Sequence, residues 1–354
     1  RTWKDFQGFP NKMLPGGHVM GSLGRRREQY GYQDMADVTE IDWDGNVVWS
    51  FNQKEFIKDD EKEYWLARQH HDYQREGNPV GYYVPGMECQ THSGNSLILC
   101  HEDVYNKRIP DKRLLDDVIV EVDWEGNIVW KWNVSDHFSE LGFDEMQKTV
   151  LFRNPNYHPI GEEGQSDWMH INSMSVLGPN KWYDQGDERF HPDNIIWDGR
   201  QTNIIAIISK ETGKIVWKLG PDYTTGKAKE IGQIIWKIGP DFTASRELRK
   251  IGQIIGQHHA HMIPRGLPGE GNILVFDNGG WAGYGAPCRT SKDGTKVDKR
   301  DYSRVIEIDP VTLKVVWEFT GSVWGGMIPS IGNTKFYSQL ISSAQRLPNG
   351  NTMI

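Results

Sequence analysis

The sequence predicts an all-β protein of the β-propeller class. The first indication is a recurring hairpin, in which two β-branched strands flank a tight turn and the second strand ends in Trp. The second is a turn followed by an apolar strand, which recurs between these hairpins. The third is composition, because 38 Gly and 15 Trp in 354 residues supply many turns and many large side chains that need regular places to pack. Four-stranded units repeated along a chain are typical of propeller blades.

The hairpin occurs four times and fixes the spacing of the blades. Its copies are residues 41–49, 122–130, 209–217 and 308–317, and they close on Trp49, Trp130, Trp217 and Trp317. Common blades are ~40–45 residues long. The copies here are about twice as far apart, so we expect long loops between strands.

The turn-and-strand unit supplies the inner part of each blade. It occurs at residues 14–20, 93–99, 267–275 and 347–354. Trp3 occupies the position of a blade-closing Trp, and residues 351–354 open a further blade. We therefore expect one β-propeller domain over residues 1–354, with four complete blades and partial blades at both ends, and one or two more blades in the full protein.

One segment departs from the repeat. The run that begins at Trp217 recurs at Trp236, and Ile231-Gly232-Gln233 recurs as Ile251-Gly252-Gln253. We interpret residues 217–255 as a local duplication that forms an inserted loop or an extra hairpin within the domain.

Charge and hydropathy argue against nucleic-acid binding and against a membrane-spanning helix. The chain has 40 Lys plus Arg and 48 Asp plus Glu, a formal net charge of −8, which argues against nucleic-acid binding. Its apolar runs are far shorter than the ~20 residues of a membrane-spanning helix. Cys89 and Cys100 flank a predicted turn, so either a disulfide or free thiols would fit, with Cys288 left over.

Histidines gather immediately before or within the strands that open blades. The groups are His70-His71-Asp72, His170-Ile171-Asn172 and His258-His259-Ala260-His261. Equivalent positions of successive blades face one central channel, so residues distant in sequence would converge there. A lone His is more often structural, but three such groups predict a shared site.

Arg200 and Asn172 could complete that site. Arg200 follows the apolar strand 194–199 and would offer a permanently charged fork to an anionic group. Asn172 would share a strand face with His170 and offer an amide donor. The alternatives are a surface arginine at a strand end and a turn-forming asparagine.

Metal binding is a competing interpretation of the same histidines. His259 and His261 share a strand face, and Asp72 could add a carboxylate. The chain has neither a Cys-x-x-Cys nor a His-Glu-x-x-His pattern, however, so we predict no metal and no cofactor.

The most specific segments of the chain are 167–173 (Asp-Trp-Met-His-Ile-Asn-Ser), 257–261 (Gln-His-His-Ala-His), 276–279 (Phe-Asp-Asn-Gly) and 342–351. Through these, in order and spacing, essentially the whole chain resembles the bacterial arylsulfotransferase (aryl-sulfate sulfotransferase) family. The resemblance implies a six-bladed propeller with its active site at the central channel. It also implies transfer of a sulfuryl group from a phenolic sulfate ester to a phenol through a sulfated His, without a nucleotide donor.

The resemblance carries over to particular residues. His258 matches the nucleophile, and His71, His170 and Arg200 match the groups that bind the sulfuryl oxygens and assist proton transfer. Asn172 matches an accessory donor, and the neighbouring histidines would serve substrate binding: His70, His259 and His261. Because this run contains further histidines at 259 and 261, the nucleophile could instead be the residue next to His258.

The resemblance also sets expectations about partners and location. The partners would be a phenolic sulfate donor and a phenol acceptor, with homo-oligomerisation left open, in the periplasm or outside the cell. Tyr82, Tyr83, Trp168 or Trp281 could stack on a phenol or pack within blades. Two other functions compete: a non-catalytic propeller for binding or extracellular assembly, and a metal- or quinone-dependent propeller oxidoreductase.

Overall fold

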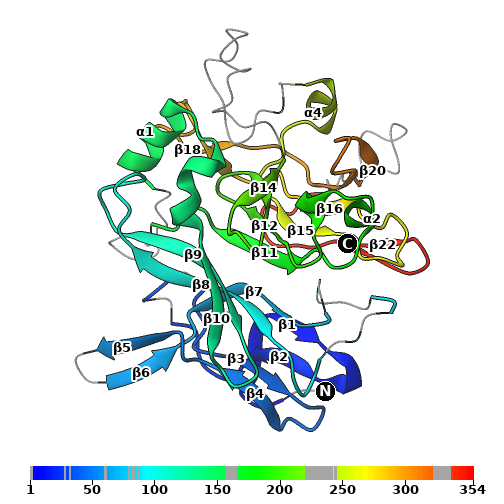
Figure 1. The fold of residues 1–354 in the computed structure, drawn as a ribbon. Helices are drawn as coiled ribbons and strands as arrows, with labels where there is room; N and C mark the ends of the chain where they lie inside the picture. The colour runs from blue at the N-terminus through cyan, green and yellow to red at the C-terminus, as the bar shows by residue number, and fades with distance from the viewer. Residues whose placement is uncertain are drawn as a thin grey trace, which may run out of the picture. The chain divides into compact units, whose positions relative to one another are not determined.

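The structure is a computed structural model, and it describes residues 3–27, 29–31, 33–59, 62–78, 80, 84–86, 88, 90–155, 166–219, 242, 245–321 and 336–354. Its regular structure is mostly β and includes four four-stranded antiparallel sheets (Figure 1). The predicted all-β class is confirmed at this level. The chain divides into two compact units, the first comprising 1–107, 111–136 and 157–167 and the second comprising 108–110, 137–156 and 168–354.

The first unit contains two of the four-stranded sheets. One sheet consists of β1 (Gln7–Met13), β2 (Val19–Ser22), β3 (Val38–Ile41) and β4 (Val47–Phe51), with the short helix η1 (Pro15–Gly17) before β2. The other consists of β7 (Gln69–Arg75), β8 (Ser96–Val104), β9 (Leu114–Val122) and β10 (Ile128–Asn133). A separate hairpin joins β5 (Glu55–Asp59) to β6 (Lys62–Leu66). The helix η2 (Val134–Leu141) follows β10 along the chain.

The second unit contains the other two large sheets. One consists of β11 (Ile171–Val176), β12 (Ile195–Gly199), β13 (Ile204–Ile208) and β14 (Ile215–Lys218). The other consists of β15 (His258–Met262), β16 (Ile273–Asp277), β19 (Arg304–Ile308) and β20 (Val315–Phe319). Two-stranded pieces are β17 (Ala282–Tyr284) with β18 (Thr295–Asp298), and β21 (Gln345–Arg346) with β22 (Thr352–Met353). The helices are α1 (Glu145–Arg153), α2 (Lys181–Asp184), η3 (Glu188–Phe190) and α4 (Arg246–Ile251).

The four predicted hairpins are confirmed as the third and fourth strands of the four large sheets. Each closing Trp lies on the fourth strand: Trp49 on β4, Trp130 on β10, Trp217 on β14 and Trp317 on β20. The predicted turn-and-strand units are the second strands β2, β8 and β16, and the last one contains β22. The sequence repeat therefore marks a repeated sheet.

The indole nitrogens join one sheet to the next. Trp49 Nε1 donates to the carbonyl oxygen of Trp124 at 3.0 Å, in the turn between the last two strands of the following sheet. Trp217 Nε1 donates to the equivalent oxygen of Pro310 at 3.0 Å. Trp3 Nε1 donates to the oxygen of Trp43 at 3.1 Å, although no strand is assigned at Trp3. Trp3 thus makes the contact of a blade-closing Trp, as its place in the repeat predicts.

A buried Arg–Glu ion pair also recurs between neighbouring sheets. Arg75, at the end of β7, donates to Glu40 on β3 at 2.8 Å, and its guanidinium lies over the rings of Trp49 and Trp124. Arg346 on β21 donates to Glu307 on β19 and lies over the ring of Trp317. An Arg on a first strand thus ties its sheet to the preceding one. Removing one member of such a buried pair is strongly destabilising.

Two sequence interpretations fall partly outside the described residues. Of the segment 217–255, the structure describes the end of β14 and helix α4, whose Ile251 packs in a core cluster, while residues 220–241 lie outside. Helix α4 ends at Ile251, the first residue of the recurring Ile-Gly-Gln run. Cys100 is a buried free cysteine on β8, Cys288 is exposed and free, and Cys89 lies outside the described residues.

Among the described residues, no helix has the length and hydropathy to cross a membrane.

Candidate functional site

His258 opens β15 and is held through both ring nitrogens. Its Nδ1 lies 2.6 Å from Asn278 Oδ1, and its Nε2 accepts the backbone N–H of Ile341 at 3.1 Å. The Asn278 amide group donates to the carbonyl oxygens of Ser338 and Ile341, so its oxygen must face the histidine. His258 is therefore protonated on Nδ1, and the lone pair is on Nε2.

The surroundings keep His258 neutral. Burial is the largest cause that lowers its pKa to about 3, followed by the positive charge of Arg200, with His170 a smaller cause. The hydrogen bond that His258 donates to Asn278 acts in the opposite direction. A neutral imidazole with a lone pair on Nε2 is a nucleophile at every physiological pH.

His170 and Arg200 are positioned together by the edge of one sheet. The backbone N–H of Arg200, directly after β12, donates to the carbonyl oxygen of His170 at 2.9 Å, directly before β11. Both side chains are buried, and both act electrostatically on His258. The structure thus brings His170, Arg200 and His258 together within the second unit.

Asn172 connects the β11 sheet to β15. Its Nδ2 donates to the carbonyl oxygen of Gln257 at 3.0 Å, next to His258. One amide proton therefore has a structural role. The predicted donation of Asn172 to a substrate stays a prediction.

His259 and His261 lie farther along β15, where the pairing with β16 shifts register. His259 Nδ1 contacts the carbonyl oxygen of Ala344 at 3.0 Å, and His261 Nδ1 contacts that of His259 at 3.0 Å. Their ring centroids are 4.4 Å apart. Their assignment to substrate binding stays a prediction.

Each predicted histidine group contains a residue in the left-handed backbone region. The φ angles are 53° at His71, 55° at His170 and 54° at His259. A positive φ is uncommon for any residue other than glycine and tends to occur at functional sites. The three groups thus share an unusual backbone feature that their sequences did not reveal.

His70 and His71 lie on β7 in the first unit. His70 is buried and His71 half-buried, and their Nδ1 atoms are 2.9 Å apart. The adjacent Asp72 forms an ion pair with Lys12 of β1. The prediction that His71 acts with His258 stays a prediction, because the two units are described separately.

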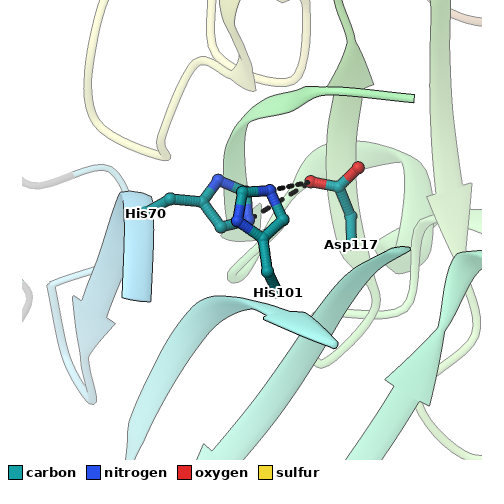
Figure 2. A group of neighbouring side chains, drawn as sticks. All are labelled: His70, His101 and Asp117. Atoms are coloured by element: carbon teal, nitrogen blue, oxygen red, sulfur yellow. Dashed lines mark ion pairs between the residues drawn. The ribbon is translucent and has the colours of Figure 1, made fainter. Parts of the chain in front are cut away.

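The first unit also holds a group that the sequence interpretation missed. His70, His101 and Asp117 each offer one potential metal-ligand atom, and these atoms lie within 4.8 Å of one another (Figure 2). It was missed because His101 and Asp117 lie 31 and 47 positions beyond His70, with no short motif that joins them. Asn278 belongs to the segment 276–279, which carries part of the family resemblance, but the sequence did not predict its contact with His258.

The structure describes two of the four predicted aromatic side chains, Trp168 and Trp281. Trp168 is fully buried and packs near Phe138 and Phe143, which agrees with the packing role, one of the two roles predicted for it. Trp281 is half-buried, with the ammonium of Lys299 4.9 Å from its ring centroid. Tyr82 and Tyr83 lie outside the described residues.

The family model described as Arylsulfotransferase (ASST) matches residues 87–354. No curated protein matches the chain. Among solved structures, a protein of unknown function from Bacteroides caccae is 12% identical over 91% of this chain and 85% of that chain, with a TM-score of 0.27. A europium-containing methanol dehydrogenase is 11% identical over 88% of this chain and 61% of that chain, with a TM-score of 0.29. Structural similarity this low does not indicate a function for the chain.

Proposed function

Because the chain belongs to the arylsulfotransferase family, we propose that it transfers a sulfuryl group from a phenolic sulfate ester to a phenol through a sulfated His258. The observation that carries the proposal is the state of His258. It is neutral, its Nδ1–H is anchored on Asn278, and its Nε2 lone pair lies in a setting that Arg200 and His170 influence. A nucleophile beside cationic and hydrogen-bonding groups suits a reaction that moves an anionic group.

In the first half-reaction, His258 Nε2 attacks the sulfur of the donor. The new N–S bond forms as the bond from sulfur to the phenolic oxygen breaks, and the leaving oxygen takes a proton from His170 or His71. Arg200 balances the charge on the sulfuryl oxygens. The Ile341 N–H must leave Nε2 before attack, because it occupies the attacking lone pair.

In the second half-reaction, the acceptor phenol returns the enzyme to its starting state. Its oxygen attacks the sulfur, the N–S bond breaks, and its proton passes to the histidine that had acted as the acid. Asn172, His70, His259 and His261 are proposed to line the substrate site. The proposed setting is a six-bladed propeller with this site at its channel, working in the periplasm or outside the cell.

The test combines turnover with detection of the intermediate. The protein is incubated with a nitrophenyl sulfate, with and without a phenol acceptor. We expect nitrophenol release that the acceptor accelerates, and a mass gain of one sulfuryl group on the peptide that contains His258.

The matched control is His191→Ala, which removes a more exposed histidine of the same unit. It should behave as wild type, whereas His258→Ala should lose both signals. If wild type shows neither turnover nor adduct, a binding function for the same fold takes precedence.

A further inference from the structure

Three adjacent strands of the first unit bring two imidazoles and a carboxylate together. His70 lies on β7, His101 on β8 and Asp117 on β9, and His101 pairs directly with Asp117 across the sheet. All three side chains are buried. Figure 2 shows both rings directed at the same carboxylate oxygen, Asp117 Oδ1. His70 Nε2 lies 3.3 Å and His101 Nε2 3.9 Å from that oxygen.

The stacking of the two rings limits their charge. The centroids of His70 and His101 are 3.6 Å apart with an interplanar angle of 9°. Two imidazolium cations at this separation would repel each other inside the protein. A bound cation would take both rings in the neutral form, with their planes tilted apart so that both Nε2 lone pairs point at it.

The far side of His101 fixes which nitrogen faces Asp117. Its Nδ1 lies 2.5 Å from Asp34 Oδ1, and Asp34 also accepts from Arg68 Nε at 2.9 Å. A carboxylate only accepts, so His101 Nδ1 carries the proton. In the neutral ring Nε2 then has a lone pair, and it makes no hydrogen bond among the described residues. A histidine that donates Nδ1–H to a carboxylate while presenting Nε2 is the usual arrangement of a metal ligand.

We propose that His70 Nε2, His101 Nε2 and Asp117 bind a divalent transition-metal ion, with Zn²⁺ as the best-fitting ion. Zinc lies about 2.0–2.2 Å from such ligands, which separates tetrahedral ligand atoms by roughly 3.3–3.6 Å. The His70–Asp117 separation meets this value, and the His101–Asp117 separation exceeds it by about 0.3–0.6 Å. Three protein ligands leave the fourth position for water or another group.

The metal would also set the tautomer of the neighbouring His71. Metal at His70 Nε2 places the proton of that ring on Nδ1, which then donates to His71 Nδ1 at 2.9 Å. His71 would accordingly carry its own proton on Nε2. This consequence rests on the proposed function of His71, whereas the metal site does not.

The experiment measures metal content and affinity without substrate. The full chain is stripped with a chelator, loaded with Zn²⁺ or Co²⁺ and dialysed, and metal is counted by mass spectrometry. We expect one ion per chain, visible absorption bands of low-coordinate Co²⁺, and a higher melting temperature with Zn²⁺. His101→Gln and Asp117→Asn should each weaken binding by about 100-fold or more, exceeding the 10–100-fold typical of outer-shell changes.

Two matched variants serve as controls. Asp116→Asn changes the neighbouring buried carboxylate, and His18→Gln changes another buried histidine that contacts a carboxylate, Glu40. Both should bind metal as wild type does. The proposal is overturned if wild type retains no stoichiometric metal, or if the cluster variants bind as tightly as these controls. Because wild type alone gives the stoichiometry and the cobalt spectrum, a variant that fails to fold leaves the test intact. Since no substrate is used, the result stands apart from the test of sulfuryl transfer.

Discussion

Two histidine groups on opening strands, one on β15 and one on β7, have contrasting surroundings. On β15, His258 is paired with the neutral amide of Asn278 and influenced by the cation Arg200. On β7, His70 lies against Asp117, which His101 also faces. Burial and a cationic neighbour disfavour protonation of His258 and suit a nucleophile, while carboxylates favour a positive charge and suit a metal ion or a proton. The same residue type at a similar place in the sheet would thus suit two proposed chemistries because its contacts differ.

The largest expected effect tests the nucleophile side of the comparison. His258→Ala should reduce sulfuryl transfer by about 10³-fold or more, because no other group would form the intermediate. His101→Gln should leave the sulfated peptide detectable, since it lies in the other group. Steady-state rates and peptide mass spectrometry measure both effects. Equal loss in the two variants would contradict the division of roles.

A smaller effect is expected from the cation beside the nucleophile. Arg200→Gln should lower kcat by about 10²-fold, since it removes one charged group that stabilises the transferring sulfuryl group. It should also raise the pKa of His258, because the charge of Arg200 lowers that pKa in wild type. A pH–rate profile measures both, and an unchanged acid limb would show that Arg200 does not act on His258.

Asn278→Asp would give His258 the kind of neighbour that His101 has. A carboxylate near Nδ1 should favour the imidazolium and move the acid limb of kcat/KM upward by about 1–3 pH units. Asn278→Leu removes the contact without adding charge and is the matched control. If both variants shift the profile equally, loss of the hydrogen bond rather than charge sets the pKa.

The smallest predicted effect concerns stability at low pH. His258 has a pKa of about 3 when folded and about 6.5 when unfolded, so the unfolded chain binds the extra proton between these values. Its contribution is present above pH 6.5 and is lost as the pH falls toward 3. Lowering the pH from 7 to 4.5 should reduce the free energy of unfolding by about 2–3 kcal/mol more in wild type than in His258→Asn. Denaturant titrations at the two pH values measure the difference, and identical losses would contradict the assignment.

The repeat was predictable because side chains that join sheets recur with them. Trp49, Trp217 and Trp3 make the same indole-to-carbonyl contact, and a contact repeated in structure leaves a repeated residue in sequence. The helix α4 was not foreseen, because the segment that contains it was interpreted by its likeness to an earlier segment. Its N-cap, the Ser245 side chain that accepts from Leu248 N–H, is a local signal that the repeat concealed.

The site was predictable only in part. His170, Arg200 and His258 could be placed together because each stands at a strand end in a recognisable motif. His101 and Asp117 could not, because their meeting depends on strand pairing between residues 16 positions apart inside apolar strands. Simple strand alternation also fails at β7, β11 and β15, where the pairing shifts register and changes the direction of the side chains.

The hydrogen bond from Ile341 to His258 would set the resting reactivity of the protein. A neutral hydrogen bond of this kind contributes about 0.5–1.5 kcal/mol, so breaking it would slow attack by at most about tenfold. In return, the hydrogen bond would shield the lone pair from other electrophiles between the proposed turnovers. Ile341 has a φ of 65°, which is unfavourable for a β-branched residue, so releasing this segment would also relieve backbone strain. A substrate that displaces the segment would therefore uncover the nucleophile at a small net cost.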